Sequence, residues 1–210
     1  MSKEIIVNRT YEETRVAVLD NSKLSDIFIE RRESEKILNN IYKGKVQNIV
    51  SGLSSAFIDI GFGKSAYLSM DDIVALKNEH NIENMLKVGQ EIMVQVYKEP
   101  ISTKGPKVTM DISLPGRLLV YMPFSNNIGV SKQIEDKEEY SRLKNIVKNL
   151  KTNLAGGIIV RTEAEDATEE EIEKEIKYLS RLWGSIINRF ANSKVGSVVH
   201  KDLGVVFQTV

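Results

Sequence analysis

Apolar and polar residues alternate along two short stretches of this chain, residues 56–60 and residues 64–68. A turn that contains two glycines separates them. Two alternating stretches around such a turn predict a β-hairpin. A hairpin centred on Phe62 places Phe57 directly opposite Tyr67, so the two rings form a cross-strand pair on one face.

The two faces of this predicted hairpin differ in character. One face carries only apolar side chains, which are Ile58, Ile60, Ala66 and Leu68. The face with Phe57 and Tyr67 also carries Asp59 and Ser65, which suit water. We therefore expect the aromatic pair to face solvent, as a platform on which unpaired bases stack. The alternative, in which both rings belong to the core, stays open at this point.

Further strand patterns surround the hairpin in the order of an OB-type barrel. The predicted strands are 41–50, 56–61, 64–70, 91–98 and 107–112, with a helical insert near 71–86. Five short strands with a helix after the third are typical of this barrel, whose second and third strands often carry the ligand. An exposed turn at 102–107 joins the last two strands.

The segments on either side of the barrel follow other patterns. Residues 4–30 predict a three-stranded antiparallel meander, and Pro115-Gly116 marks a break after the barrel. The remainder reads as α+β, with strands at 118–122, 156–160, 197–199 and 205–208 and helical spacing over 140–150. A last helix begins at a capping box of Thr168 and Glu171, and its apolar positions recur every three or four residues.

Composition places the chain among ordinary globular proteins. Of its 210 residues, 41% are hydrophobic and 28% are charged. Cysteine is absent, which excludes disulfides and suits a reducing cytosol. The start does not read as a signal peptide, and no apolar run approaches the roughly 18 residues that a membrane span needs. We therefore expect a cytoplasmic protein with no membrane span.

Charge constrains how the chain could hold a nucleic acid. The 29 basic residues balance the 29 acidic ones, whereas a protein that binds RNA by bulk charge would be more basic. RNA binding would therefore depend on stacking and on locally placed lysines. The candidates to flank the aromatic platform and meet phosphates are Lys43, Lys45, Lys64 and Lys104, although each of them taken alone fits an ordinary surface lysine better.

Catalytic chemistry has little support in the sequence. His80 and His200 stand apart, no Cys/His spacing suits zinc, and no nucleophile–base pair emerges. The acidic residues of 163–175 read as a helix start that the helix dipole favours. Arg161-Thr162 follows an apolar strand and matches a terminal phosphate, although a surface arginine in a strand–helix connection fits the same dipeptide.

Several motifs together resemble the ribonuclease E/G family. Residues 40–46, 56–61 and 67–68 resemble its S1-type RNA-binding domain, and residues 158–162 resemble its 5′-sensor. Arg15-Val16-Ala17 and Ile27–Glu30 resemble the first part of its RNase H-like domain, and His200-Lys201 resembles the return to that domain.

The resemblance spans nearly the whole chain and implies a fold class. This fold is α+β: a five-stranded OB-type, S1-like barrel inserted in a partial RNase H-like sheet, followed by an α+β 5′-sensor segment. The implied segments are 1–35 for the first RNase H-like part, 36–113 for the barrel, 114–196 for the sensor and 197–210 for the return.

The same resemblance implies an endoribonuclease of RNA processing and decay, and it leaves open whether precursor ribosomal RNA or messenger RNA is processed. Such an enzyme cleaves single-stranded RNA and favours 5′-monophosphorylated ends. By resemblance, the RNA strand is held by Phe57, Tyr67 and Lys104. The pocket for the terminal phosphate is implied to consist of Gly116, Val120, Arg161 and Thr162.

The family's catalytic Mg²⁺ is held by Asp residues of a DNase I-like domain that has no counterpart in these 210 residues. The resemblance therefore implies no catalytic residue, metal ligand or cofactor here, with Mg²⁺ and any homo-oligomer belonging to the full-length enzyme. We expect the chain to bind RNA without cutting it. Two alternatives stay open: a stand-alone, non-catalytic RNA-binding protein, and an OB-type protein-interaction module.

Overall fold

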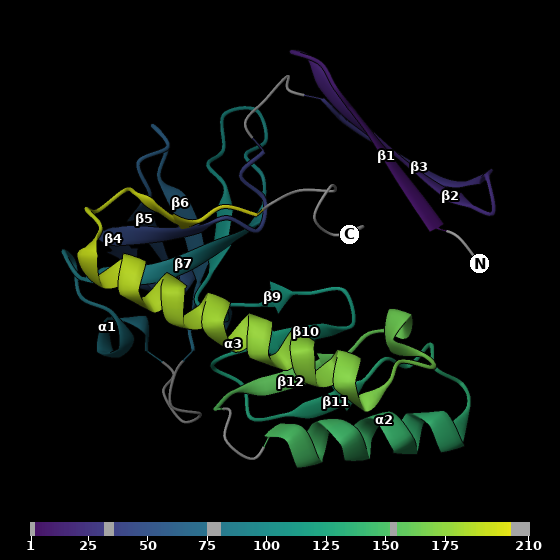
Figure 1. The fold of residues 1–210 in the computed structure, drawn as a ribbon. Helices are drawn as coiled ribbons and strands as arrows, with labels where there is room; N and C mark the ends of the chain where they lie inside the picture. The colour runs from purple at the N-terminus through teal and green to yellow at the C-terminus, as the bar shows by residue number, and fades with distance from the viewer. Residues whose placement is uncertain (1–2, 32–35, 75–80, 152–154, 203–210) are drawn as a thin grey trace. The chain divides into compact units, whose positions relative to one another are not determined.

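The structure is a computed structural model that describes residues 3–31, 36–74, 81–151 and 155–202 (Figure 1). The chain divides into two compact units. One contains the N-terminal residues through Ile37, and the other is Leu38–Lys201. The limits of the four segments expected from the sequence stay predictions.

The N-terminal unit is an antiparallel meander. Its strands are β1 (Lys3–Arg9), β2 (Glu13–Asp20) and β3 (Lys23–Arg31), in the order β1-β2-β3. The turn between β2 and β3 places Asn21 and Ser22 at positive φ, as a tight hairpin requires. The predicted meander is therefore confirmed, although its side chains stay mostly exposed and only Val16 is buried among those that the structure describes.

The second unit contains the barrel that the strand pattern predicts. Its strands are β4 (Ile41–Val50), β5 (Ser55–Asp59), β6 (Ala66–Ser69), β7 (Glu91–Lys98) and β8 (Lys107–Thr109). They run in the order β4-β5-β6-β8-β7, and β4 also pairs with β7. Because β6 and β8 are parallel and the other pairs antiparallel, the result is a closed, mixed, five-stranded barrel of OB type.

The described parts of the predicted helical insert contain two short helical turns. A 3-10 turn spans Met70–Asp72 and one helical turn, α1, spans Ile82–Met85, while the part of the prediction at 75–80 lies outside the described residues. Inside the barrel, Val46, Ile58, Leu68 and Val94 are fully buried. Gly44 lies so close to this core that a Cβ there would come 2.5 Å from Cγ2 of Ile58.

A small sheet with two helices completes the second unit. Its strands are β9 (Leu114–Pro115), β10 (Leu119–Met122), β11 (Ile128–Val130) and β12 (Gly157–Val160), in the order β11-β12-β10-β9. The helices are α2 (Lys137–Leu150) and α3 (Glu169–Asn192). One face of the sheet, with Leu119, Tyr121, Ile158 and Val160, packs against buried residues of both helices.

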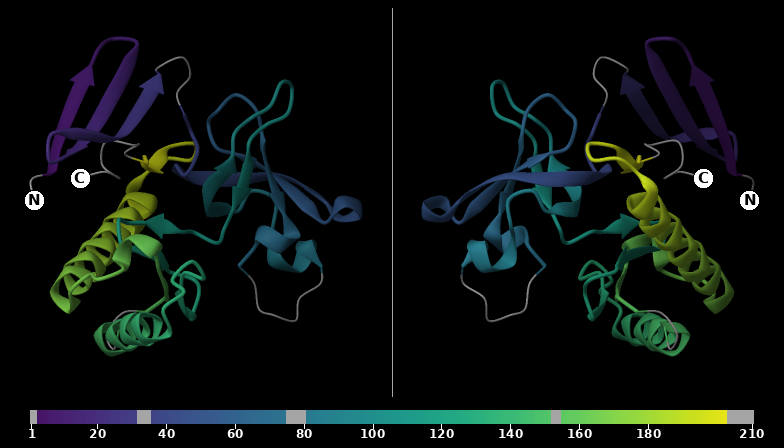
Figure 2. Two further views of the ribbon diagram at one scale, coloured as in Figure 1. Left: turned by 90° about the vertical axis from the view of Figure 1, so that its right-hand side faces the viewer. Right: turned by 90° about the vertical axis from the view of Figure 1, so that its left-hand side faces the viewer.

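Both ends of α3 are fixed by contacts. At its start the predicted capping box is confirmed, since Glu171 N donates to the Thr168 hydroxyl (3.3 Å) and Thr168 N donates to the Glu171 carboxylate (2.9 Å). At its other end, the side views of Figure 2 show α3 reaching β4 of the barrel. The strand β13 (Val198–His200) then pairs with β4, and the strand predicted at 205–208 lies outside the described residues.

Replacing Gly44 tests how tightly the barrel is packed. We expect Gly44→Ala to lower the free energy of unfolding by about 1–3 kcal/mol, because the new methyl group overpacks the core against Ile58. Urea unfolding followed by circular dichroism measures this. Gly52→Ala is the matched control, since its added Cβ meets no atom within 4 Å; an equal loss in both variants would contradict the packing argument.

Candidate nucleic-acid interface

The outer surface of β5 and β6 carries the predicted aromatic pair. Phe57 lies opposite Tyr67 in the ladder, which confirms the register predicted from the hairpin pattern. The ring centroids are 6.1 Å apart and the ring planes cross at 75°. Since Ile58, Ala66 and Leu68 fill the barrel side, both rings lie outside that core and stay half-buried. A base that lies flat on one ring would meet the edge of the other.

A lysine that the sequence reasoning did not select stands beside this pair. Because β8 runs parallel to β6, Lys107 is the ladder partner of Tyr67. Its Nζ lies 5.5 Å from the centroid of the Tyr67 ring, in cation–π geometry. The OB strand order, which sets the last strand beside the third, is the signal that could have identified it.

A third ring continues the same outer surface. Tyr97 follows the buried Val96 on β7 and is exposed; its hydroxyl donates to the Asp72 carboxylate at 3.2 Å. Burial raises the pKa of Tyr97, and Asp72 and Tyr67 add to this rise. The outer face of the barrel therefore presents three aromatic rings and the ammonium of Lys107.

Two of the predicted lysines lie at one end of the hairpin. Lys64 Nζ donates to the Ser102 carbonyl at 2.7 Å, and Tyr67 N donates to the Pro106 carbonyl at 2.8 Å. These bonds hold the loop between β7 and β8 against the hairpin. Lys104 is exposed in that loop, and Lys45 is exposed on β4.

The structure does not place Lys43 among the flanking lysines, which corrects that expectation. Only 8% of Lys43 is exposed. Its Nζ lies 2.9 Å from the Glu91 carboxylate and 5.2 Å from the centroid of the Phe190 ring. The reason is that the Phe190 ring of α3 covers the Lys43 side chain, while Glu91 of β7 neutralises its charge.

The predicted phosphate residues lie near the end of β12. Arg161 Nη1 donates to the Gly116 carbonyl at 2.6 Å, and Nη2 lies 3.0 Å from Oε1 of Glu163. Val120 is the ladder partner of Ile159, and both project from the sheet face opposite the buried Leu119. The structure therefore brings Arg161 into direct contact with Gly116, at the outer face that carries Val120.

Thr162 is held by a different set of partners. Its hydroxyl donates to Oε1 of Gln133 at 2.9 Å and lies 3.2 Å from the Ser131 hydroxyl. Both partners follow β11, a three-residue strand that the sequence reasoning did not predict. The two candidate phosphate donors are thus adjacent in sequence but are held by separate parts of the fold.

A half-buried carboxylate from α3 organises the loop that contains Gly116. Glu175 accepts hydrogen bonds from the backbone N–H of Leu118 (2.9 Å to Oε1) and of Leu119 (3.1 Å to Oε1). Burial raises the pKa of Glu175, while these N–H groups and the charges of Arg117 and Arg161 oppose the rise. Gly116 leaves room for this carboxylate, because a Cβ there would collide with Glu175 Oε1.

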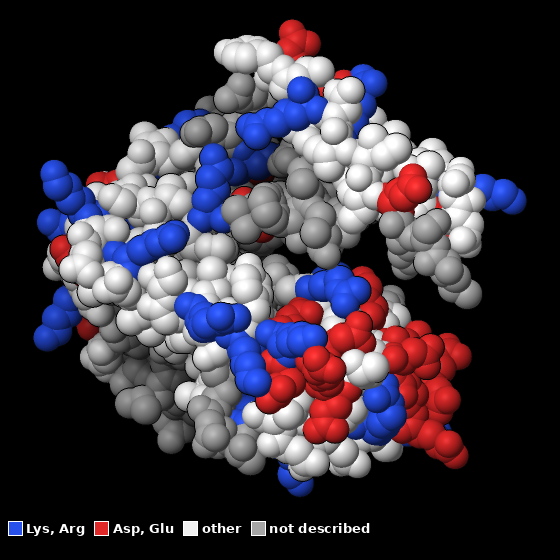
Figure 3. Space-filling view, in the orientation of Figure 1, with Lys and Arg blue, Asp and Glu red and all other residues white. Residues whose placement is uncertain are grey.

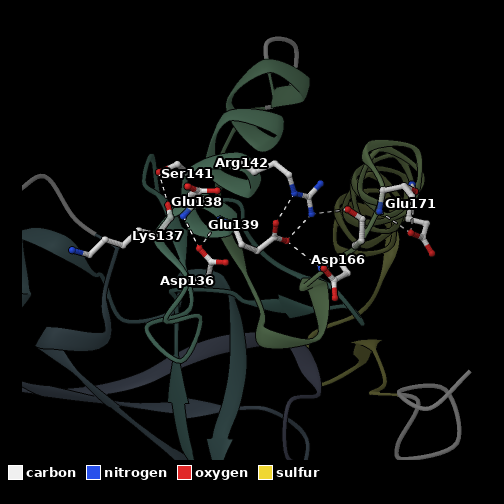
Figure 4. A network of polar contacts seen from close by, with 10 residues as sticks. Asp136, Lys137, Glu138, Glu139, Ser141, Arg142, Asp166 and Glu171 are labelled. Carbon is white, nitrogen blue, oxygen red and sulfur yellow. Dashed lines mark hydrogen bonds and ion pairs between the residues drawn. The ribbon is translucent and has the colours of Figure 1, made fainter.

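Acidic side chains gather over the N-terminal ends of α2 and α3, at the lower right of Figure 3. Figure 4 shows the side chains of Glu139 and Arg142 pointing from α2 toward Asp166 and the N-terminal end of α3. Arg142 Nη2 donates to Glu139 (2.6 Å) and to the Ala167 carbonyl (2.9 Å), and the bond from Arg142 lowers the pKa of Glu139. The charge of Arg142 is therefore used within the protein.

Two further features of the described residues concern metal ions and membranes. Across the described ranges, no three His, Asp or Glu side chains lie close enough together to hold a metal ion. We assign no metal-dependent step to these residues. No helix in the described part of the chain is long and apolar enough to cross a membrane.

The closed mixed barrel, the small sheet and the few helices define an α+β protein with an OB-type fold. Comparison with known sequences goes further. A family model described as "Ribonuclease E/G family" matches residues 113–210. Ribonuclease G of Haemophilus influenzae is 42% identical in an alignment 210 positions long, which covers 95% of this chain and 43% of that protein. The chain belongs to the ribonuclease E/G family.

Two other relatives agree. Ribonuclease G of Escherichia coli is 41% identical over 90% of this chain and 41% of that protein. Ribonuclease E of a Nostoc species is 30% identical over 96% of this chain and 29% of that protein. The chain therefore spans about two-fifths of the length of these ribonuclease G sequences. A solved structure of an a/eIF2alpha-aDim2p-rRNA complex from Pyrococcus horikoshii matches with a TM-score of 0.32 and 17% sequence identity. The match covers 58% of this chain and 67% of that chain, and no conclusion about this chain rests on it.

Truncating Glu175 tests its role in the Gly116 loop. We expect Glu175→Ala to lower the free energy of unfolding by about 1–3 kcal/mol, because two backbone N–H groups lose their acceptor. Glu175→Gln keeps one acceptor oxygen and should lose less. Urea unfolding followed by the fluorescence of Trp183, the single tryptophan, measures both.

The same measurement has a predicted pH dependence. The folded state holds the Glu175 proton more tightly than the unfolded state, because the pKa is raised on folding. The stabilising effect of this proton is present at low pH and is lost as pH rises through the raised pKa. The advantage of the wild type over Glu175→Gln should therefore shrink as pH rises. The control is Glu173→Ala, which loses only a solvent-exposed ion pair with Lys177. If Glu173→Ala lowered the free energy of unfolding as much as Glu175→Ala, the role assigned to Glu175 would be contradicted.

Proposed function

We propose that this chain binds single-stranded RNA and recognises a 5′-monophosphate, as part of a ribonuclease E/G-type endoribonuclease that acts in cytoplasmic RNA processing and decay. The observation that carries this proposal is the Phe57–Tyr67 pair on the outside of the barrel, with Lys107 over the Tyr67 ring. Every base has a face that stacks on an aromatic ring, so such a surface binds unpaired strands with little regard to sequence.

The lysines around the rings suit the RNA backbone. Lys45, Lys64 and Lys104 are exposed, and the loop of Lys104 is held against the hairpin by the bond from Lys64. Because the net charge of the chain is zero, these local charges and the stacking surface must supply the affinity. A surface with few phosphate contacts also predicts a shallow dependence of that affinity on salt.

Recognition of the terminal phosphate is proposed for Arg161 and Thr162. A guanidinium has five N–H donors in a planar fork that matches phosphate oxygens, and the contacts with Gly116 and Glu163 use two of them. The Gly116 carbonyl fixes one end of the fork near the exposed sheet face of Val120. A terminal monophosphate carries more negative charge than an internal diester, which favours the end of a strand at this arginine.

RNA cleavage belongs, in this proposal, to the longer family enzyme. The ribonuclease G relatives are more than twice as long as the part matched here, and the described residues contain no group of three His, Asp or Glu side chains placed to hold a metal ion. Residues 1–210 would therefore supply RNA recognition, and the Mg²⁺-dependent chemistry would come from sequence beyond them.

Removing the rings tests the RNA surface. We expect Phe57→Ala and Tyr67→Ala each to weaken binding of an unstructured, 3′-labelled decanucleotide by about 5- to 150-fold, the equivalent of about 1–3 kcal/mol for one lost stack. Fluorescence anisotropy measures the Kd. Phe124→Ala removes an exposed ring outside the barrel and serves as the control. Unchanged affinity in folded Phe57 and Tyr67 variants would refute the platform and favour a protein-interaction module.

The terminal phosphate is tested with two RNAs of one sequence. We expect the wild type to bind the 5′-monophosphate form more tightly than the 5′-hydroxyl form, and Arg161→Ala to lose this difference while it still binds the 5′-hydroxyl RNA. Arg181→Ala, which removes one exposed positive charge from α3, should keep the difference. Equal binding of both RNAs by the wild type would contradict 5′-sensing by these residues.

A further inference from the structure

The guanidinium of Arg161 has one fixed contact and one exchangeable contact. Its fixed contact is the Gly116 carbonyl, 2.6 Å from Nη1, in a loop that Glu175 and the bond from Gly116 N to the Leu119 carbonyl hold in place. Its other contact is the carboxylate of Glu163, 3.0 Å from Nη2. The Glu163 side chain is 54% exposed and that of Arg161 is 35% exposed.

The local fold does not require this carboxylate. Glu163 is the middle residue of a 3-10 helix over Thr162–Ala164. That turn is closed by backbone bonds from Ala164 N to the Arg161 carbonyl and from Glu165 N to the Thr162 carbonyl. Arg161 is already oriented by Gly116. The contact between Glu163 and Arg161 therefore adds little to the geometry of the turn, and as an exposed ion pair it is weak enough to be displaced.

A carboxylate and a phosphate make the same demand on an arginine. Both accept charge-assisted N–H bonds from the guanidinium fork, so they compete for the same donors. A phosphate that approaches Arg161 must displace Glu163 and then tolerate a negative charge close by. The second candidate donor is also engaged within the protein, since the Thr162 hydroxyl donates to Gln133.

We propose that Glu163 is a specificity-determining residue, whose carboxylate competes with the 5′-terminal phosphate of RNA for Arg161. The inference rests on the proposed function of Arg161 and deepens it. Glu163 occupies the arginine when no monophosphorylated end is present. It thereby lowers the affinity for 5′-monophosphate RNA while leaving the affinity for 5′-hydroxyl RNA unchanged.

The test is the isosteric substitution Glu163→Gln in the 210-residue chain. Binding of one unstructured decanucleotide is measured by fluorescence anisotropy, in its 5′-monophosphate and 5′-hydroxyl forms, at one fixed salt concentration. We expect the Kd for the 5′-monophosphate form to fall about three- to tenfold, with the Kd for the 5′-hydroxyl form unchanged. The gain should vanish in the double variant with Arg161→Ala.

Glu165→Gln is the matched control, because it removes an equal charge from an exposed position two residues away. An equal gain in this control would show a general charge effect and overturn the role of Glu163. A wild type that prefers the 5′-monophosphate, with the same preference in Glu163→Gln, would overturn the inference and leave 5′-sensing intact. No preference in either protein would overturn both. A preference that appears only in Glu163→Gln would support the competition while contradicting 5′-sensing by the wild type.

Discussion

Closure of the barrel between β4 and β7 is the constraint on which the outer surface of the second unit depends. Once the ladder is closed, every strand must place one set of alternate side chains inside and the other outside. Ile58 and Leu68 go inside, so Phe57 and Tyr67 must go outside. Closure also requires β8 to lie beside β6, which sets Lys107 against the Tyr67 ring. The aromatic surface is thus a consequence of the hydrogen-bond pattern as much as of the residues themselves.

The helix α3 connects this barrel to the smaller sheet. Near its beginning, Glu175 holds the backbone of Leu118 and Leu119, and near its end, Phe190 covers Lys43 on β4. One stripe of the helix is buried throughout, with Ile172, Ile176, Leu179 and Ile186. The surroundings of Arg161 and the solvent exposure of β4 therefore depend on how one helix packs.

Local pattern was enough to predict the parts of the structure that depend on local pairing. The alternation at 56–60 and 64–68 fixed the hairpin register, and Thr168 with Glu171 marked the start of α3, because each signal lies within a few residues. The burial of Lys43 could not be predicted in this way, since its contacts Phe190 and Glu91 come from segments that are distant in the sequence. The strand β11 is three residues long with a central glycine, too short for a periodic signal. The acceptors of Arg161 and Thr162 likewise come from Gly116 and Gln133, which only the folded chain brings near.

The 75° angle between the rings of Phe57 and Tyr67 has a consequence for the shape of an RNA strand bound as proposed. Successive bases in a helical stack stay nearly parallel, whereas these two rings offer planes that cross. A strand that lays one base on each ring must turn its backbone sharply between neighbouring nucleotides. A flexible, unpaired strand can make that turn, but a base-paired duplex would have to break its stack. Crossed rings would then exclude duplexes by geometry alone, without reading a single base edge.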